Sequence, residues 1–474
     1  MYCDADDFSS WDRADFMADR AFQLYEDGQI SQALTQLREA IGINPTNSAW
    51  HFNAGLAFDS MDDFENAIKA YKDALELCPD DPEILNCLAI DYTRTGRYDL
   101  AISTFEHIEQ IAPDFEPCYC NRIITYTEME QHDKAEQMFY LAQQIHSDCP
   151  LCFYNIGNSL FSRQQYDRAI WCWDRTALLE PTHPQINYRI AQAHWANGNA
   201  KLARDHFLHE LRNDPGDTDV ILDFGIFLLK EGQIDAAKEK FNRILELTSD
   251  SAAAIFYLGE SALQQNFMVE AQRYYRQAIE KDPEIGGPRY RLAQMAIDSG
   301  ETEKAKELLC EELMLAVEDI DILLSISAMF IRIGATDCAI DTLLGIMDED
   351  QKNATAFHYM GVAMAMQGEK EGAMHFLEHA VGLDDGNPEF LAETAAIYLE
   401  NGCMEEASRC IRNAAKLDSA GVDIARLDKR IRHARICRDL RRCFASLPVV
   451  QHVRLLAGRC RTRFNRKIRT AGKH

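Results

Sequence analysis

The sequence predicts an all-α protein, an α-solenoid of twelve 34-residue helix-turn-helix repeats. The first observation behind this prediction is an alanine that returns every 34 residues from Ala33 to Ala407, with no insertion or deletion. The second is that small, large apolar and turn-forming residues recur in the same frame between residues 14 and 421. The third is that 24 Gly and 13 Pro in 474 residues are few for a turn-rich all-β protein. An unbroken period of this length indicates stacked helical hairpins, because a single hairpin cannot cover its own apolar face.

The positions within a repeat, counted with Ala14 as position 1, have readable roles. Apolar residues at positions 4, 8 and 11 and at 20, 24 and 27 have helical spacing and predict two amphipathic helices. Position 8 is small in every repeat except the one with Ile123, and position 24 is always large and apolar, so we expect the large side chain to fill the space between closely approaching helices. Gly at position 15 in eight repeats predicts a left-handed turn, and Pro at position 32 in six predicts the end of the second helix.

The predicted organisation has four parts: an acidic N-terminal lead (1–13), the repeats, a capping helix (422–447) and a basic amphipathic tail (448–474). The repeats are 14–47, 48–81, 82–115, 116–149, 150–183, 184–217, 218–251, 252–285, 286–319, 320–353, 354–387 and 388–421. Where position 32 is not Pro, we expect the loop to the next repeat to be less sharply set. Repeats 286–319 and 320–353 fit the pattern least well.

Charge is distributed unevenly along the chain. The net charge of −27 divides into +13 on residues 422–474 and −40 on the other residues. An acidic body of this kind should repel free nucleic acid and anionic membranes and attract basic partner segments. No stretch approaches the roughly 18 uncharged apolar residues of a membrane span, and Asp4, Asp6 and Asp7 stand where a secretory signal would carry basic residues. We therefore expect a cytoplasmic protein.

The repeat pattern is clearest from Ser48 to Asp81, SAWHFNAGLAFDSMDDFENAIKAYKDALELCPDD, with small residues at positions 8 and 20, an aromatic at 24 and Pro at 32. This combination resembles the tetratricopeptide repeat family over residues 14–421. The resemblance implies a right-handed superhelix whose first helices line a concave groove, where members of the family bind extended or helical peptide segments of other proteins. The related pentatricopeptide RNA-binding arrays have a period of 35, so the unbroken 34 here argues against them.

The same resemblance implies which side chains face the groove, namely positions 2, 5, 9, 12 and 13 of the first helices. The predicted peptide-binding residues mix aromatic anchors with amide groups: Tyr154, Asn158, Phe161, Tyr188, Gln192, Trp195, Leu222, Ile226, Phe256, Glu260, Tyr290 and Gln294. The alternative is that positions 5 and 12 belong partly to the core and that the aromatic rings only pack against neighbouring helices. Position 5 is never Lys, which argues against the carboxylate clamp of chaperone-binding members.

Two patterns suggest metal chemistry. The sequence His375-Phe376-Leu377-Glu378-His379 matches an H-x-x-E-H motif, but Leu377 is a core position of an ordinary second helix, so we expect two exposed histidines and no catalysis. The cysteines are candidate zinc ligands in a C-x-C and a C-x-x-C pair, with structural thiols as the alternative: Cys118, Cys120, Cys149 and Cys152. The spacing matches no known zinc finger or knuckle, and we predict no cofactor.

The tail beyond Pro448 is a basic amphipathic segment. Its cations could contact an anionic membrane or a nucleic acid, or the tail could fold back on the acidic solenoid: Arg454, Arg459, Arg461, Arg463, Arg466, Lys467 and Arg469.

With twelve repeats filling the chain, no room remains for a catalytic domain. The sequence therefore predicts a non-enzymatic scaffold or adaptor that binds basic or amphipathic peptide segments of partner proteins, with no small-molecule substrate. Two alternatives stay open: a tether whose tail docks to membrane or nucleic acid, and a structural protein that assembles with copies of itself. The sequence does not identify the partner protein.

Overall fold

The structure is a computed structural model that describes residues 10–315, 319–384, 386–417 and 429. The predicted capping helix, apart from Lys429, and the basic tail lie outside these residues. The chain divides into two compact units, residues 1–247 and 248–474, each with its own hydrophobic core. The described residues are helical with no strand, as an all-α solenoid requires.

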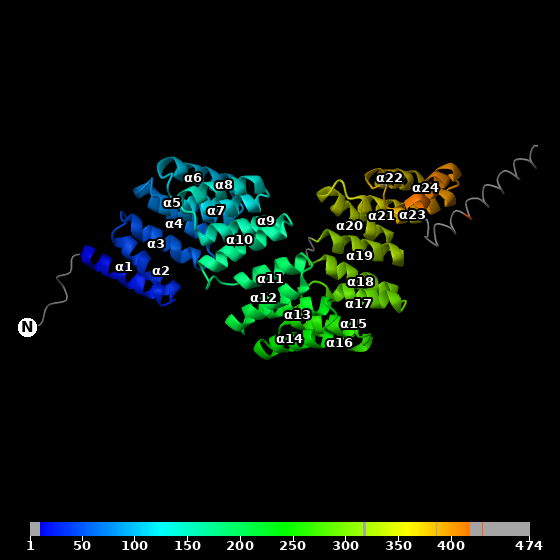
Figure 1. Cartoon of the computed structure of the whole chain (residues 1–474), viewed down its shortest axis with the longest axis horizontal. Coiled ribbons are helices and arrows are strands. Elements are labelled where there is room, and N and C mark those ends of the chain that lie inside the picture. The colour runs from blue at the N-terminus through cyan, green and yellow to red at the C-terminus, as the bar shows by residue number, and fades with distance from the viewer. Residues whose placement is uncertain (1–9, 316–318, 385, 418–428, 430–474) are drawn as a thin grey trace, which may run out of the picture. The chain divides into compact units, whose positions relative to one another are not determined.

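In both units, consecutive helices pair as antiparallel hairpins that follow one another in chain order (Figure 1). The first unit contains α1 (Ser10–Glu26), α2 (Ile30–Ile43), α3 (Ser48–Asp59), α4 (Phe64–Leu77), α5 (Pro82–Arg94), α6 (Tyr98–Ile111), α7 (Glu116–Glu128), α8 (His132–Ile145), α9 (Pro150–Ser162), α10 (Tyr166–Leu179), α11 (Ile186–Ala196), α12 (Ala200–Asn213), α13 (Thr218–Lys230) and α14 (Ile234–Leu247).

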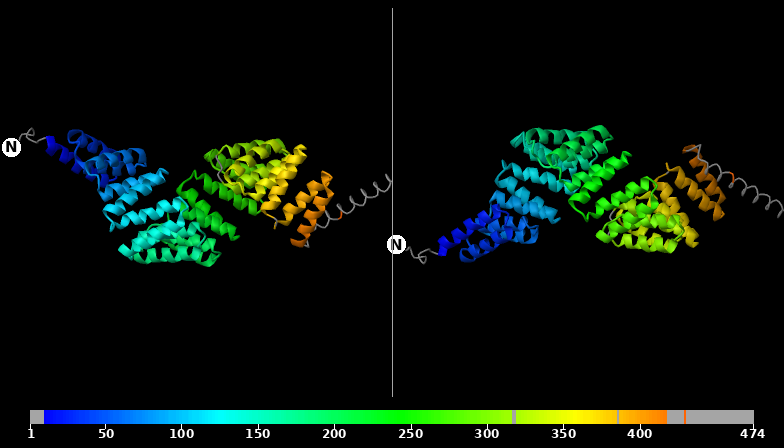
Figure 2. Two further views of the ribbon diagram at one scale, coloured as in Figure 1. Left: turned by 90° about the horizontal axis from the view of Figure 1, so that it is seen from above. Right: turned by 90° about the horizontal axis from the view of Figure 1, so that it is seen from below.

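The second unit contains α15 (Ala252–Gln264), α16 (Met268–Lys281), α17 (Pro288–Asp298), α18 (Thr302–Leu313), α19 (Ile320–Ile333), α20 (Thr336–Glu349), α21 (Ala354–Gln367), α22 (Lys370–Leu383), α23 (Pro388–Glu400) and α24 (Met404–Leu417). Figure 2 shows the hairpins of each unit from two further sides. The first helix begins at Ser10, inside the segment 1–13 that the sequence analysis assigned to a lead, so that boundary was placed too late.

The first helices begin at capping residues that the repeat places just before them. Position 34 supplies a side-chain oxygen that accepts a hydrogen bond from the backbone N–H groups of the next helix in seven of the described repeats: Asn47, Asp81, Asp217, Ser251, Asp319, Asn353 and Asn387. Such caps satisfy backbone donors that a helix cannot pair internally. In these repeats the frame therefore fixes where the first helix starts as well as how it packs.

The core of each hairpin follows the predicted division into small and large positions. Every alanine of the 34-residue series, from Ala33 to Ala407, has 0% exposure. An added Cβ on Gly157 would lie 2.4 Å from Nε1 of Trp173, and one on Gly225 would lie 2.5 Å from Cε1 of Phe241. The ring at position 24 thus occupies the space that a side chain at position 8 would need, as the sequence predicts.

One repeat has a large residue at position 8, and its packing shows why the others have a small one. Ile123 stands at position 8 and is fully buried, and the residue at position 24 of the same repeat, Phe139, is only partly buried. The ring of Phe139 instead packs edge-on against Phe153 of the next repeat, with centroids 5.4 Å apart. A large side chain at position 8 therefore displaces the residue at position 24, which is buried in the other hairpins.

The turn within each hairpin is left-handed at all twelve occurrences of position 15. Eight of these residues are the predicted glycines, and the other four also have positive φ: Asp62, Glu130, Gln164 and Asn266. The turn is set by the packing of the two helices and not by glycine alone, because these four residues adopt a backbone that costs a non-glycine residue about 1 kcal/mol or more.

Proline at position 32 is not needed to end the second helix. Second helices end at the same position whether Pro79 or Ser147 follows, at Leu77 and Ile145 respectively. The expectation that loops without this proline are less sharply set was wrong for the helix ends that are described, apart from α18. That helix stops two residues early, at Leu313, in one of the two repeats expected to be atypical.

None of the helices in the described part of the chain combines the length and apolarity needed to cross a bilayer.

A pair of glycine substitutions in the second unit tests the packing rule. An alanine Cβ at Gly259 would lie 2.6 Å from the ring of Tyr275, whereas Gly345 on α20 has no atom within 4 Å of the added carbon. We expect Gly259→Ala to lower the free energy of unfolding by about 1–3 kcal/mol through overpacking. Gly345→Ala should raise it by about 0.5–1 kcal/mol, because alanine is the better helix former. Urea denaturation followed by circular dichroism measures both, and equal effects would contradict the rule.

Candidate functional site

The twelve predicted groove residues lie on the first helices α9, α11, α13, α15 and α17, and all of them are half-buried. Tyr154 to Ile226 belong to the first unit, and Phe256, Glu260, Tyr290 and Gln294 to the second. Each unit therefore presents its own set. These side chains pack against neighbours on one side and face solvent on the other, and their role in peptide binding stays a prediction.

In the first unit, polar groups of this set are tied to the next repeat. The hydroxyl of Tyr188 donates to Oδ2 of Asp223 at 2.6 Å, and Nε2 of Gln192 donates to the same oxygen at 3.0 Å. Burial, and then the bond to Asp223, raises the pKa of Tyr188. The ring of Trp195 packs edge-on against Phe227 at 5.6 Å, with Nζ of Lys230 4.9 Å from the Trp195 ring. These contacts fix the positions of the side chains, and the Tyr188 hydroxyl and the Gln192 amide each already donate a hydrogen bond to Asp223.

Similar bonds join position 5 of one first helix to position 6 of the next elsewhere in the chain. Nδ2 of Asn121 donates to Oδ1 of Asn86 at 3.0 Å, and His358, which is fully buried, pairs through Nε2 with Glu393 at 2.8 Å. Position 5 is thus partly a structural position, and its hydrogen bonds to position 6 of the next repeat were not foreseen from the sequence.

The second unit contains a hollow of about 610 Å³. It lies over α15, α17 and the start of α19, and two of the predicted groove residues, Phe256 and Tyr290, line it. Tyr257 and Ile322 extend the apolar wall, with the Phe256 and Tyr257 rings 5.1 Å apart. A hollow with aromatic walls can accept the side chain of a bound segment.

The charge of this hollow is negative. Arg291 is the cation among its lining residues, and Nε and Nη2 of its guanidinium donate to Glu260 at 2.9 and 2.7 Å. Burial alone would lower the pKa of Arg291, but the bonds to Glu260 outweigh it and raise the pKa, so the guanidinium stays charged and paired. The exposed carboxylates of Glu284, Asp319 and Asp321 therefore dominate the rim.

A buried carboxylate shapes the floor of the hollow. Glu312 is 1% exposed, and its oxygens accept from the backbone N–H groups of Gly287 and Tyr290, the latter at 3.2 Å. It thereby caps α17, which begins two positions later than most first helices, at Pro288. Glu210 does the same for the late-starting α11, accepting from the N–H groups of Asn187 and Tyr188 at 3.1 and 3.3 Å.

These two glutamates were missed by the sequence analysis although the signal was present. Position 27 holds alanine, isoleucine or threonine in the other repeats, so a glutamate there departs from the core pattern. A buried carboxylate needs partners, and the unpaired backbone donors at a helix start supply them.

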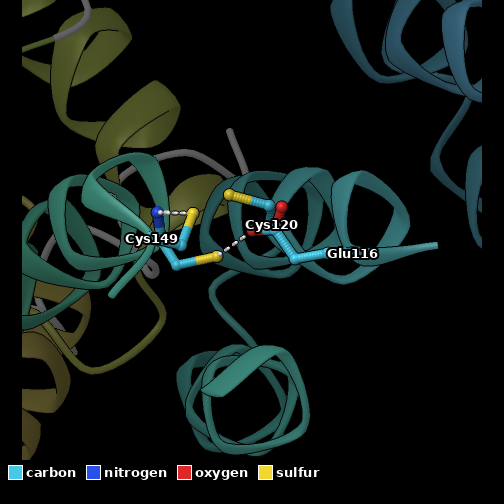
Figure 3. A group of neighbouring side chains, drawn as sticks. Glu116, Cys120 and Cys149 are labelled. Carbon is cyan, nitrogen blue, oxygen red and sulfur yellow. Dashed lines mark hydrogen bonds between the residues drawn. The ribbon is translucent and has the colours of Figure 1, made fainter. Parts of the chain in front are cut away.

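Three of the four candidate cysteines lie close together in the first unit, and Glu116 takes the place predicted for Cys118. The ligand atoms of Glu116, Cys120, Cys149 and Cys152 all lie within 4.8 Å of one another (Figure 3). Cys118 is not part of this group, because its Sγ donates to the carbonyl of Phe105 at 3.3 Å. The neighbouring thiols of Cys120 and Cys152 lower the pKa of Cys149, and burial raises that of Glu116.

The H-x-x-E-H motif forms no such group within the described residues. His375, Glu378 and His379 are all exposed on α22, as expected. His379 stacks on Phe357 at 4.3 Å, and Glu378 accepts from the hydroxyl of Tyr398 at 3.1 Å. These contacts are those of an ordinary helix surface.

Comparison with known families bears directly on the repeats. A family model described as tetratricopeptide repeat matches residues 154–218 and 222–284, and another described as TPR repeat matches residues 60–96. The chain is a tetratricopeptide repeat protein. Proteins with this fold typically mediate protein–protein interactions and are generally not catalytic.

Curated relatives of this tetratricopeptide repeat protein are distant. The TPR repeat-containing protein YpiA of Bacillus subtilis is 22% identical over 239 residues, which cover 50% of this chain and 56% of YpiA. Cellulose synthase operon protein C of Komagataeibacter xylinus is 29% identical over 131 residues, 27% of this chain and 10% of that protein. The match thus spans about a tenth of the cellulose synthase operon protein.

Solved structures with a similar arrangement include two with high coverage. The yeast Tom70 structure has a TM-score of 0.40 at 15% identity and covers 93% of this chain and 98% of its own. The Cut9–Hcn1 assembly has a TM-score of 0.41 at 12% identity, over 88% and 96% of the two chains.

The cap on α17 leads to a prediction that runs against the repeat pattern. Glu312→Ala restores the residue most common at position 27, yet it leaves two backbone donors at Gly287 and Tyr290 without their partner. We expect a loss of about 1–2 kcal/mol in the free energy of unfolding, the range of a lost helix cap. Ala278→Gly, which removes a side chain at the same position of the preceding repeat, is a reference for simple loss of packing. A gain in stability on Glu312→Ala, measured by urea denaturation, would contradict the assigned cap.

Proposed function

We propose that this protein is a non-enzymatic adaptor that binds a basic, amphipathic peptide segment of a partner protein in the hollow of the second unit. The observation that carries the proposal is the hollow itself, which joins an aromatic wall at Phe256, Tyr257 and Tyr290 to a rim of exposed carboxylates. Aromatic anchors in a partly desolvated hollow are the usual source of binding energy in peptide recognition. The family's general role in protein–protein interaction agrees with this assignment.

The chemistry of the bound segment follows from the lining residues. An aliphatic or aromatic side chain of the segment would enter between Phe256 and Tyr290, and flanking Lys or Arg residues would pair with Glu284 and Asp321 on the rim. Arg291 would not repel them strongly, because Glu260 neutralises it through two hydrogen bonds. Of the twelve predicted groove residues, the proposal therefore concerns only those of the second unit: Phe256, Glu260, Tyr290 and Gln294.

The test uses a probe of defined composition. A fluorescent synthetic peptide with the sequence of residues 448–474 is basic and amphipathic, and a version with every Lys and Arg replaced by Glu is its control. Fluorescence anisotropy should show binding of the basic peptide, weakening with salt, and little binding of the acidic one. Comparing the full chain with one ending at Gly421 shows whether the chain's own tail competes for the hollow.

Substitutions locate the binding. Phe256→Ala with Tyr290→Ala should weaken the basic peptide about tenfold or more, because both walls of the hollow are removed. Phe267→Ala is the matched control, since Phe267 is 55% exposed in the same unit but does not line the hollow. Equal affinity of the double variant and the unaltered chain would overturn the assignment, and a loss with Phe267→Ala alone would move the site to the α15–α16 turn.

Tethering and self-assembly remain predictions of the sequence, as does a cytoplasmic location. Tighter binding of the 448–474 peptide to vesicles of anionic lipid or to duplex DNA than to the chain would favour tethering. A mass that rises with concentration in light scattering would favour self-assembly.

A further inference from the structure

We propose that Glu116, Cys120, Cys149 and Cys152 form a zinc-binding site in the first unit. Their four ligand atoms lie within 4.8 Å of one another, and three come from cysteine thiols (Figure 3). In a tetrahedral site with Zn–S bonds of about 2.3 Å, the sulfur atoms lie about 3.8 Å apart. The four side chains would therefore need to move inward by only about 1 Å to enclose an ion.

Helix geometry brings the four side chains together. Glu116 and Cys120 are one turn apart at the start of α7 and so share a face, while Cys118 lies between them on another face. Cys149 caps α9 and Cys152 lies in its first turn, and the N–H of Cys152 donates to Sγ of Cys149 at 3.3 Å. A thiolate at this place is stabilised by the helix start.

Neighbouring groups hold the cluster in a single arrangement. Sγ of Cys152 donates to Oε1 of Glu116 at 3.1 Å, so the two pairs already touch. Nδ2 of Asn155 donates to the carbonyl of Cys120 at 3.2 Å and lies 3.7 Å from its sulfur. Such outer contacts orient metal ligands in known zinc sites.

The cap position gives a second, independent observation. Position 34 carries Asn, Asp or Ser as an oxygen cap in seven of the described repeats, but before α9 it carries Cys149, whose sulfur is a weaker acceptor. A cysteine at this position therefore makes a weaker helix cap than Asn, Asp or Ser, and a second role for its sulfur would explain its presence. Ligation of a metal ion, together with two further thiols and a carboxylate at the same point, is such a role.

The donor set selects the ion. Cys120, Cys149 and Cys152 are 1%, 6% and 0% exposed, and Glu116 is half-buried, which describes a closed site with four protein ligands. Three soft thiolates favour zinc over magnesium or calcium, which take oxygen ligands. A disulfide would use two of the sulfurs and leave the third thiol and the carboxylate beside it unexplained.

Binding would tie the start of α7 to the start of α9. This is the part of the unit where Ile123 displaces Phe139, so the hairpin α7–α8 lacks the buried residue that the others have at position 24. Each thiol releases its proton on binding, and zinc affinity should fall as the pH is lowered. The site lies in the first unit and does not depend on peptide binding in the second.

Metal analysis of the full chain is the first test. The chain, purified with reducing agent and without chelator, should contain one zinc ion per molecule. After the zinc is removed with a chelator, added Co²⁺ should give the visible absorption of tetrahedral cobalt together with thiolate-to-cobalt charge transfer, and added Zn²⁺ should abolish both. The thermal midpoint should be higher with zinc than without it.

Matched cysteine variants locate the ligands. Cys149→Ser and Cys120→Ser should lose the bound zinc and the charge-transfer band, and Glu116→Gln should bind at least about tenfold more weakly. Cys118→Ser is the control, because Cys118 is equally buried on the same helix and its hydrogen bond to Phe105 can be made by a hydroxyl. Circular dichroism confirms that each variant is folded, and the Co²⁺ spectrum of the unaltered chain tests the site without any substitution.

Two results would overturn the proposal. One is a reduced, folded chain that holds no stoichiometric zinc and gives no thiolate-to-cobalt band. The other is a Cys118→Ser variant that loses zinc as completely as Cys149→Ser, since the ligands would then not be those the geometry selects.

Discussion

Close approach of the two helices in each hairpin is the constraint on which the rest of the structure depends. It requires a side chain no larger than alanine at position 20, and Ala33 and its eleven counterparts are completely buried there. It also requires that positions 8 and 24 share one space, as Gly157 and Trp173 do. Once this contact is fixed, the reversal between the helices is so tight that the chain adopts a left-handed residue at position 15 even where glycine is missing, as at Gln164.

Much of this fold could be predicted because the information is periodic. A pattern of small, apolar and turn-forming residues that recurs twelve times in the sequence predicts the helices, the turn and the core face. Pro79 and its counterparts were given too much weight, because the loss of packing beyond position 30 ends a helix such as α8 with Ser147 in the same place. The helix at Ser10 was missed, since it begins before the periodic pattern does.

The candidate sites were harder to predict because they depend on departures from the period. Spacing singled out Cys118, Cys120, Cys149 and Cys152 as candidates, but it could not show which of them come together from two repeats. Helical geometry applied within α7 would have separated Cys118 from Cys120 and added Glu116, which lies one turn before Cys120. The groove residues were placed correctly on the first helices, yet bonds such as Tyr188 to Asp223 join residues 35 positions apart and depend on how one repeat sits on the next.

The hollow of the second unit can itself be traced to such a departure. Because α17 starts late, at Pro288, residues Gly286 and Gly287 form open backbone where most other repeats have the first turn of a helix, and both line the hollow. Gly287 has a φ of 102°, and its N–H is paired with the buried carboxylate of Glu312. In the first unit, α11 also starts late over Glu210, but Pro184 and Gln185, which both carry side chains, occupy the corresponding positions. The absence of side chains at Gly286 and Gly287 thus leaves space beside Phe256 and Tyr290, while the buried Glu312 keeps the shortened helix capped. The regular repeats thus maintain the packing of the hairpins, and the late start of α17, which Glu312 caps, leaves the hollow open.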